Sequence, residues 1–526
     1  MRLSNLSPYD VHGTSLPAGT ELVGYSALVH SLKVEAPLRS FSVASARHVK
    51  GGTRSEGLWR VYDRRYKPPA TFAGHLTFSL RHEDIDLALI KRIFLAVPVK
   101  TVTEYVKAEP TGTAARRAWF LYEKLLGKRL NIPDAGPVAA VDILDARRYI
   151  TATPQLSRRH RVRDNFLGTE TFNPIIRRTP IIEQYLARDL AAQAQDTVGR
   201  TGAHVLTRAA SFLLLADSRA SFEIEGETPP RNRLERWGKA VLQAGKNPLT
   251  LPEILRLHAL LIEDNRFTQP GIRTEGVFLG DRDHLGDPVP EFIGARPDDL
   301  SPLMAGLIAA NNRMREAGID PVLQASATAF GFVYVHPFED GNGRLHRCLI
   351  HHVLADRRFT PPGFVFPVSS VMQDRIDDYR KALRAHSGPL MDFIQWRPTP
   401  KRNIEVLNDT GDLYRYYDCT GVAEFLFACV ARTVDEDLPR EIAYLQSYDD
   451  ARRRIMDRVD MPDRLADDLI LFIRQNKGRL SGKRRRKEFV KLTDPEVSDI
   501  EAIVREAFAE AALLDREKVA EADSTP

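Results

Sequence analysis

The stretch FGFVYVHPFEDGNGRLHRCLIHHVLA, residues 330–355, decides the fold of this chain and carries most of its chemistry. An apolar segment runs into His336-Pro337-Phe338, and proline lacks a backbone donor and disfavours helical geometry at the residue before it. The sequence therefore predicts that a helix ends at His336 and that Phe338 anchors the turn in the core. A second helix is expected to begin near Arg344.

The tripeptide Gly341-Asn342-Gly343 separates these two predicted helices. Two glycines around an asparagine adopt positive φ at low cost, so successive backbone amides can point into one concavity. The following helix adds the positive end of its dipole. Arg344 and Arg347 are three residues apart, share a helix face and can grip phosphate oxygens. Together these features predict a pocket for a diphosphate or a triphosphate.

Asp340 and His336 add the two groups that a transfer reaction needs. Mg²⁺ is usually held by one or two carboxylates together with phosphate oxygens and waters, which suits Asp340. A histidine has an ordinary pKa near neutrality and can take a proton from an alcohol, which suits His336. Each part alone has a structural explanation, and Asp340 could simply cap the following helix. The combination favours a phosphotransfer or nucleotidyl-transfer site.

Residues 336–347, HPFEDGNGRLHR, resemble the signature of the Fic (Fic/Doc) family, H-x-F-x-D/E-G-N-G-R-x-x-R, with every fixed position met. The resemblance covers roughly residues 175–400 and implies a helical core with a β-hairpin flap. It also implies a protein adenylyltransferase, which uses ATP and Mg²⁺ to transfer AMP to a Ser, Thr or Tyr hydroxyl of a target protein or of itself. Family members also transfer UMP, phosphate or phosphocholine, and some remove AMP, so these alternatives stay open.

The resemblance assigns a role to each residue of the signature. His336 is expected to be the general base and Asp340 the metal ligand. The residues expected to bind the phosphates are Gly341, Asn342, Gly343, Arg344 and Arg347. The flap is expected over residues 271–296, where two short apolar pieces flank a turn rich in Gly, Asp and Pro. Strand addition is the expected mode of target binding, along an edge formed by Thr274, Glu275, Gly276, Val277, Phe278 and Leu279.

Upstream, Ser221-Phe222-Glu223-Ile224-Glu225-Gly226 resembles the family's inhibitory motif, S/T-x-x-x-E-G/N. The motif is expected to end a helix over residues 205–226, with Gly226 as its C′ residue and Ser221 helping to hold the helix down. A Glu225 carboxylate against Arg347 would occupy the guanidinium meant for the γ-phosphate, so that ATP would bind misaligned. The structural alternative is a solvated glutamate before a loop.

The chain divides into three expected parts, and its fold class is expected to be mainly α. Residues 1–173 are interpreted as an α+β module of unknown function, with strands over 19–34 and 57–68. Residues 174–400 are expected, by the resemblance, to form the Fic core. Residues 401–526 are interpreted as a helical module for DNA binding or target docking. In that module the amphipathic segment 494–514 is expected to pack in a core or to form a dimer contact.

The basic run at residues 483–487, KRRRK, has two interpretations: a site for nucleic-acid phosphates or a solvated face. A rival to the enzyme reading is therefore a nucleic-acid-binding regulator with a vestigial Fic core. The net charge of 75 − 70 = +5 permits an acidic partner without requiring one. The sequence shows no apolar run long enough for a membrane span and no signal peptide, so a cytoplasmic protein without a membrane partner is expected.

Overall fold

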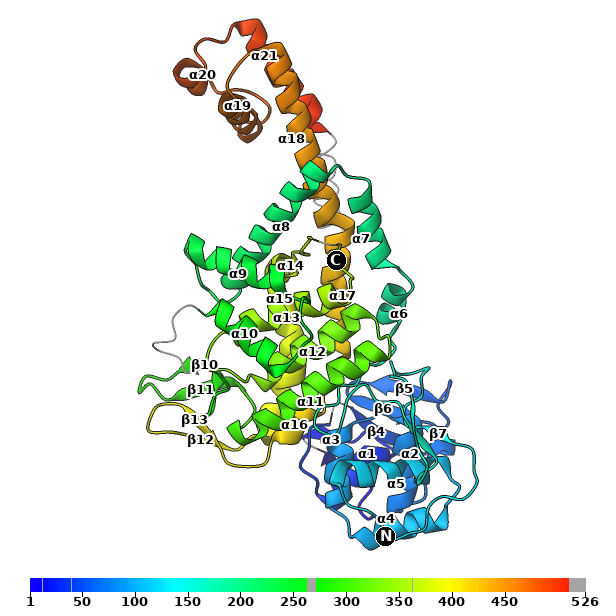
Figure 1. Cartoon of the computed structure of the whole chain (residues 1–526). Helices are drawn as coiled ribbons and strands as arrows, with labels where there is room; N and C mark the ends of the chain where they lie inside the picture. The colour runs from blue at the N-terminus through cyan, green and yellow to red at the C-terminus, as the bar shows by residue number, and fades with distance from the viewer. Residues whose placement is uncertain (12, 39, 263–270, 362, 510–526) are drawn as a thin grey trace. The chain divides into compact units, whose positions relative to one another are not determined.

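A computed structural model describes residues 1–11, 13–38, 40–262, 271–361 and 363–509 (Figure 1). The chain divides into two compact units. The first comprises residues 1–184, 247–353 and 377–426, and the second comprises 185–246, 354–376 and 427–526. This division joins stretches that were assigned from the sequence to different domains, and the two expected boundaries remain predictions. Residues 510–526 of the expected C-terminal module lie outside the described residues.

A four-stranded sheet in the order β3-β4-β6-β5 forms the N-terminal part of the first unit. Its strands are β3 (Thr20–Leu22), β4 (Phe41–Ser45), β5 (Thr53–Glu56) and β6 (Trp59–Tyr62). Strand β4 runs parallel to β6, and the other two pairs are antiparallel. The strand expected over 57–68 is therefore correct at β6.

The strand expected over 19–34 is wrong beyond Leu22, because helix α1 (Gly24–Leu32) follows it at once. The reason is a tertiary contact that no local pattern contains. The carboxylate of Glu83 accepts a hydrogen bond from Tyr25 N at 2.8 Å and so caps the start of α1. Gly24 has a φ of 58°, and a Cβ there would lie 2.0 Å from Glu83 Oε2, so only glycine fits.

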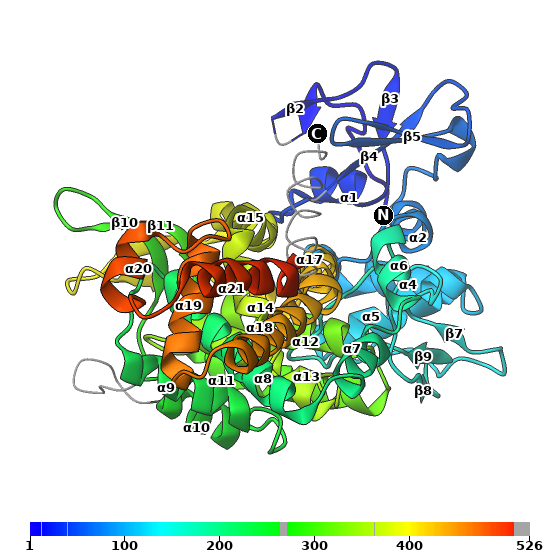
Figure 2. The ribbon, with the colours of Figure 1, turned by 90° about the horizontal axis from the view of Figure 1, so that it is seen from above.

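Helices and short strands complete the N-terminal part. Pro98 separates two helices and is the N-cap of the second. The remaining elements are β1 (Asp10–Val11), β2 (Thr14–Ser15), η1 (Arg64–Tyr66), α2 (Phe72–His82), α3 (Leu87–Leu95), α4 (Val99–Ala108), α5 (Thr113–Leu126), β7 (Val141–Asp142), β8 (Gln155–Ser157) and β9 (Val162–Asp164). The last three strands form a small sheet in the order β7-β9-β8, which the sequence analysis did not predict (Figure 2).

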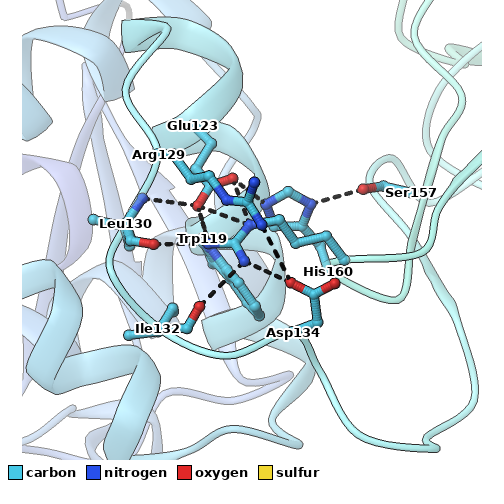
Figure 3. A network of polar contacts seen from close by, with 9 residues as sticks. Trp119, Glu123, Arg129, Leu130, Ile132, Asp134, Ser157 and His160 are labelled. Carbon is cyan, nitrogen blue, oxygen red and sulfur yellow. Dashed lines mark hydrogen bonds and ion pairs between the residues drawn. The ribbon is translucent and has the colours of Figure 1, made fainter.

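A buried ion-pair network fastens α5 to this small sheet (Figure 3). The carboxylate of Glu123 accepts hydrogen bonds from Trp119 Nε1 at 2.7 Å and from Leu130 N at 2.9 Å. It also accepts hydrogen bonds from Arg159 Nη2 at 2.8 Å, and His160 Nε2 lies 3.0 Å away. The side chains of Glu123 and Arg159 are 12% and 14% exposed, so this charge pair is held largely away from water.

The helices that carry the candidate site follow in the first unit. Thr250 caps α10 by accepting a hydrogen bond from Glu253 N. The elements are α6 (Pro180–Leu186), α10 (Leu251–Leu261), β10 (Phe278–Arg282), β11 (Pro288–Ile293), α11 (Pro297–Glu316), α12 (Pro321–Val335), α13 (Asn342–Asp356), α15 (Ile376–Ser387), η2 (Gly388–Phe393), β12 (Trp396–Pro398), β13 (Ile404–Val406), α16 (Gly411–Arg415) and α17 (Thr420–Arg432). Strands β10 and β11 form an antiparallel hairpin within the expected 271–296 segment.

The second unit is helical among its described residues. Its C-terminal helices pack around a core that includes Ile455, Leu469, Ile470, Ile500 and Val504. The elements are α7 (Leu190–Gly199), α8 (Ala203–Glu223), α9 (Arg231–Gln243), α14 (Val368–Asp374), η3 (Thr433–Asp437), α18 (Leu438–Arg458), α19 (Asp463–Gln475), α20 (Gly482–Glu488) and α21 (Asp494–Ala507). The fold is mainly helical, as expected. None of the helices in the described ranges has the length and apolar character to span a membrane.

Candidate active site

His336 stands at the C-terminal end of α12 in a left-handed conformation, with φ 55° and ψ 60°. It is 6% exposed. Its Nδ1 lies 3.0 Å from Val333 O, and because a carbonyl can only accept, Nδ1 carries the proton. The basic nitrogen is therefore Nε2. Burial lowers the pKa of the His336 imidazole to about 4, so the ring is neutral at pH 7.

The turn after His336 is held by Phe338 and Asn342. Phe338 is fully buried, which confirms its predicted role as the anchor. The Asn342 side chain donates to Phe338 O at 2.8 Å and accepts from Phe338 N at 3.0 Å. Because this amide closes the turn, Asn342 could reach a phosphate only through its backbone N–H, in the first turn of α13.

Only one of the two glycines takes the conformation expected of both. Gly341 has a φ of 79°, and a Cβ there would lie 2.7 Å from Ile262 Cδ1. Gly343 is instead the second residue of α13. The expectation of positive φ at Gly343 is wrong because the helix begins two residues before the expected Arg344. The amides of residues 342–344 therefore form the N-terminal end of a helix, which favours an anion.

The charged residues of the signature converge on this helix start. Asp340, whose side chain is half exposed, accepts hydrogen bonds from Arg344 Nη2 at 3.0 and 3.1 Å. Arg344 and Arg347 are 1% and 2% exposed. Asp340 therefore offers an accessible carboxylate beside the buried guanidinium of Arg344. This donor set fits Mg²⁺, which needs only one or two carboxylates when phosphate oxygens and waters supply the other ligands.

His258 on α10 supports the same loop and was missed by the sequence analysis. Its Nε2 lies 2.9 Å from Asp340 O, so it donates to that carbonyl. Its ring stacks on Phe338 with centroids 3.9 Å apart and planes inclined by 10°. A signal was present in the sequence, because His258 falls on the buried stripe of α10 with Ile254, Leu257 and Leu261.

The predicted flap edge is partly engaged by a second hairpin. Thr274 to Val277 precede β10, whereas Phe278 and Leu279 begin it. Asn403, in the β12–β13 turn, donates from Nδ2 to Gly276 O at 2.7 Å, and Lys401 pairs with Glu275. Of the expected edge, Phe278 and Leu279 on β10 are therefore the residues that these two contacts leave unengaged. This second hairpin was not predicted from the sequence.

The residues of the expected inhibitory motif lie in the second unit. Ser221 is fully buried on α8, and Glu225 is exposed. Gly226 has a φ of 75°, and its N–H donates to Glu223 O at 2.9 Å. Helix α8 ends at Glu223 with Ile224 as its C-cap, so the helix stops earlier than expected and Gly226 lies beyond the expected C′ position. A regulatory role for Glu225 remains a prediction.

The basic run forms α20 and is only partly neutralised. Arg484 pairs with Glu488, and Arg485 pairs with Asp494. Lys483, Arg486 and Lys487 are exposed and form no ion pair with any residue that the structure describes. This helix therefore presents three uncompensated positive charges.

Comparison with known proteins identifies the region of the site. Residues 248–354 match the Fic/DOC family. A Fido domain-containing protein of Dictyostelium discoideum is 32% identical over 148 residues, which are 28% of this chain and 88% of that protein.

A protein adenylyltransferase, fic-1, of Caenorhabditis briggsae is 25% identical over 158 residues, which are 30% of this chain. The match spans only 28% of that relative's length. A Fic domain-containing signaling protein from Bacteroides thetaiotaomicron aligns with a TM-score of 0.34 at 19% identity, covering 50% of this chain and 96% of that one.

Proposed function

This chain belongs to the Fic/DOC family, and on that premise we propose that it is a protein adenylyltransferase that transfers AMP from ATP to a hydroxyl side chain of a protein. The observation that carries the proposal is the buried, Nδ1-protonated His336 five residues before the Gly341 turn that leads into α13. The adenylyltransferase name of relatives from Caenorhabditis and Nematostella vectensis supports the choice of AMP as the transferred group.

The transfer is a single displacement at the α-phosphorus of ATP. His336 Nε2 accepts the proton of the Ser, Thr or Tyr hydroxyl of the target. The hydroxyl oxygen forms a bond to the α-phosphorus, the bond to the bridging oxygen of the β-phosphate breaks, and pyrophosphate leaves. A neutral imidazole is the form that this step needs, and the lowered pKa of His336 supplies it at pH 7.

The remaining residues of the signature would hold the nucleotide. The N–H groups at the start of α13 and the guanidiniums of Arg344 and Arg347 would neutralise the phosphates. Asp340 would hold Mg²⁺, which supplies charge stabilisation to the phosphates when it is bound. For this to happen, Arg344 must exchange its contact with Asp340 for one with a phosphate oxygen, and the half-exposed carboxylate leaves room for that exchange.

We also propose that Glu225 restrains the reaction by competing with the γ-phosphate for Arg347, and that the β10 edge of the flap aligns the target segment. The exposed Glu225 just after the end of α8, followed by the left-handed Gly226, supports the first proposal. A Glu225 carboxylate paired with Arg347 would leave ATP bound but displaced, and a displacement of about 1 Å can cost about a hundredfold in rate.

The test is incorporation of label from ATP into protein. The Glu225→Gly chain, incubated with Mg²⁺ and α-labelled ATP, should incorporate about a hundredfold more label than the unmodified chain. His336→Ala in the same background should abolish incorporation, and γ-labelled ATP should give none. Label from the γ-position would instead indicate a kinase. Equal labelling with and without Glu225 would remove the autoinhibition proposal.

The alternative of a nucleic-acid-binding regulator rests on the three uncompensated charges of α20. It requires that the chain shift duplex DNA in a salt-dependent way, and that the shift survive His336→Ala but not charge reversal at Lys483, Arg486 and Lys487. Such binding without any nucleotide transfer would favour the alternative over the enzyme.

A further inference from the structure

A buried arginine, Arg273, joins the base of the flap to the loop that carries His336. It is 2% exposed. Its Nε donates to His336 O at 2.7 Å, its Nη1 donates to Glu275 O at 2.6 Å, and its Nη2 donates to Ala295 O. Its backbone N–H donates to Pro337 O at 3.0 Å. One residue therefore contacts the histidine loop twice and both ends of the flap.

The partners of the Arg273 guanidinium are unusual for a buried cation. All three are main-chain carbonyls, and no carboxylate of the described chain pairs with it. Burial lowers its pKa to about 10, so the side chain stays charged at neutral pH. Apolar residues could tie two segments together without the cost of desolvating a charge. A planar guanidinium, by contrast, fixes the directions of several acceptors at once.

The part of the chain that Arg273 fixes is the backbone at His336. A left-handed conformation is uncommon for a residue with a Cβ and needs support from its surroundings. The flap backbone comes directly against it: a Cβ on Gly294 would lie 3.0 Å from His336 Cβ and 3.1 Å from Arg273 Nη2. Ala295 N also donates to Val335 O at 3.2 Å. Any shift of the flap base would therefore move His336.

We propose that Arg273 is a positioning residue for the transfer reaction. It holds the main chain of His336 in register with the flap, so that the imidazole meets the hydroxyl that the flap presents. The inference rests on the proposed function and extends it to a residue outside the signature. Loss of this tie should lower the rate of transfer while leaving the binding of ATP nearly unchanged.

The first arm of the test compares two conservative variants of the full chain, each made with and without Glu225→Gly. Arg273→Lys keeps the charge but loses the fork of donors. Arg116→Lys is the matched control, because Arg116 is 3% exposed and its Nη1 donates to Ala139 O at 2.9 Å and to Arg161 O at 2.8 Å. We expect Arg273→Lys to lower kcat about 10- to 100-fold with KM for ATP within about threefold, and Arg116→Lys to change neither.

The second arm is independent of activity. Amide hydrogen exchange should become about tenfold faster at residues 272–279, 293–296 and 336–341 in Arg273→Lys, and not in Arg116→Lys. Helix α19 should exchange at the same rate in every chain. Millimolar guanidinium should restore transfer to Arg273→Ala but not to His336→Ala.

Each outcome decides one part of the inference. Unchanged exchange in the three segments, or a raised KM for ATP with unchanged kcat, would overturn the role of Arg273. The proposed function would be overturned if neither the unmodified chain nor its Glu225→Gly form incorporated label. In that case faster exchange in Arg273→Lys would still establish the tie between flap and loop.

Discussion

At the residue scale, the candidate site depends on two left-handed backbone positions only five residues apart, His336 and Gly341. They are supported in different ways. The conformation of His336 is supported by the hydrogen bond that its carbonyl accepts from Arg273 and by the one that its Nδ1 donates to Val333 O. Gly341 needs no such support, because glycine adopts positive φ freely and leaves room for Ile262.

Gly341→Ala should therefore impair transfer more than it impairs folding. Its Cβ would meet Ile262 Cδ1 at 2.7 Å in addition to the strain of a φ of 79°. We expect a stability loss of about 2 kcal/mol and a loss of transfer of about a hundredfold, because the turn positions the phosphates. Thermal unfolding and labelling from ATP would measure the two effects.

Gly318→Ala provides the control for this prediction. Gly318 has a φ of 67° and no atom within 4 Å of its added Cβ, so the alanine meets backbone strain without a clash. Gly318→Ala should lower the free energy of unfolding by about 1 kcal/mol and leave transfer unchanged. If both substitutions reduced transfer equally, the contact with Ile262 would not matter.

The lowered pKa of His336 makes a prediction about pH. A general base acts in its neutral form, so kcat/KM should be flat from pH 7 down to about 5. It should decline only as the pH approaches 4, the folded pKa of the free imidazole. An unperturbed histidine would already lose half its activity near pH 6.5. Initial rates of AMP incorporation between pH 5 and pH 7.5 separate the two cases.

The residues of the signature could be predicted from the sequence because their chemistry is local. The end of the helix at His336 follows from Pro337, and the buried Phe338 follows from its place in the turn. Arg273 could not be predicted in this way. Its partners Glu275, Ala295 and His336 are brought together only by the folded hairpin, and a lone arginine in a loop carries no signal of burial.

At the element scale, the Glu123 network shows how a short sheet with little core of its own is held in place. Burial alone would raise the pKa of Glu123, but hydrogen bonds from Arg159, Trp119 and Leu130 N outweigh it and lower the pKa to about 2. The carboxylate is thus more stable in the folded chain than in the unfolded one. Its contribution to stability is complete above its unfolded pKa, near 4.5.

Glu123→Gln should lower the free energy of unfolding by about 3 kcal/mol at pH 7, because it removes the buried carboxylate that pairs with Arg159 and leaves that charge only its ion pair with the exposed Asp134. The difference from the unmodified chain should shrink as the pH falls from about 5 towards 2, since protonation removes the same charge from Glu123. Thermal unfolding at a series of pH values measures it.

Glu104→Gln is the control for the Glu123 prediction. The Glu104 side chain is 60% exposed, and its pair with Lys100 spans 3.8 Å on the surface of α4. Glu104→Gln should change the free energy of unfolding by less than about 0.5 kcal/mol at every pH. A pH-independent loss in Glu123→Gln would show that the network acts through packing rather than through charge.

Two features explain which elements could not be predicted from the sequence: a long-range contact and very short strands. The start of helix α1 is fixed by its cap, Glu83, which lies more than fifty residues away in the chain. The β7-β9-β8 sheet has strands of two or three residues, too short for an alternating pattern to appear. The β10–β11 hairpin was predicted because its turn residues are contiguous with its strands.

At the scale of the whole molecule, the expected boundary at residue 173 falls inside a packed segment of the first unit. Asn173 N donates to Arg415 O at 2.8 Å, and Ile175 N donates to Tyr417 O at 2.9 Å. Phe172 is fully buried, and its ring centroid lies 5.7 Å from that of Tyr417. The N-terminal part is thus joined to the helices of the site by main-chain hydrogen bonds, by the Phe172 ring and by ion pairs such as that of Lys91 with Asp412.

Phe172 has a specific partner in the helix that ends at His336. A Cβ on Gly331 would lie 2.4 Å from Phe172 Cζ, so the ring sits directly on the backbone of α12. Phe172→Ala should open a cavity there and lower the free energy of unfolding by about 3–5 kcal/mol. If the two parts fold as one, hydrogen exchange should accelerate together in α12 and in strands β4 and β6.

The exposed Phe212 on α8, at 49% exposure, supplies the control, and Phe212→Ala should change unfolding by less than about 1 kcal/mol. Acceleration in Phe172→Ala confined to α12 would mean that the N-terminal sheet is an independent domain. Joint acceleration would mean that the sheet helps to hold the helix from which His336 projects. In that case, a change in the N-terminal part would alter the rate of transfer without touching the site.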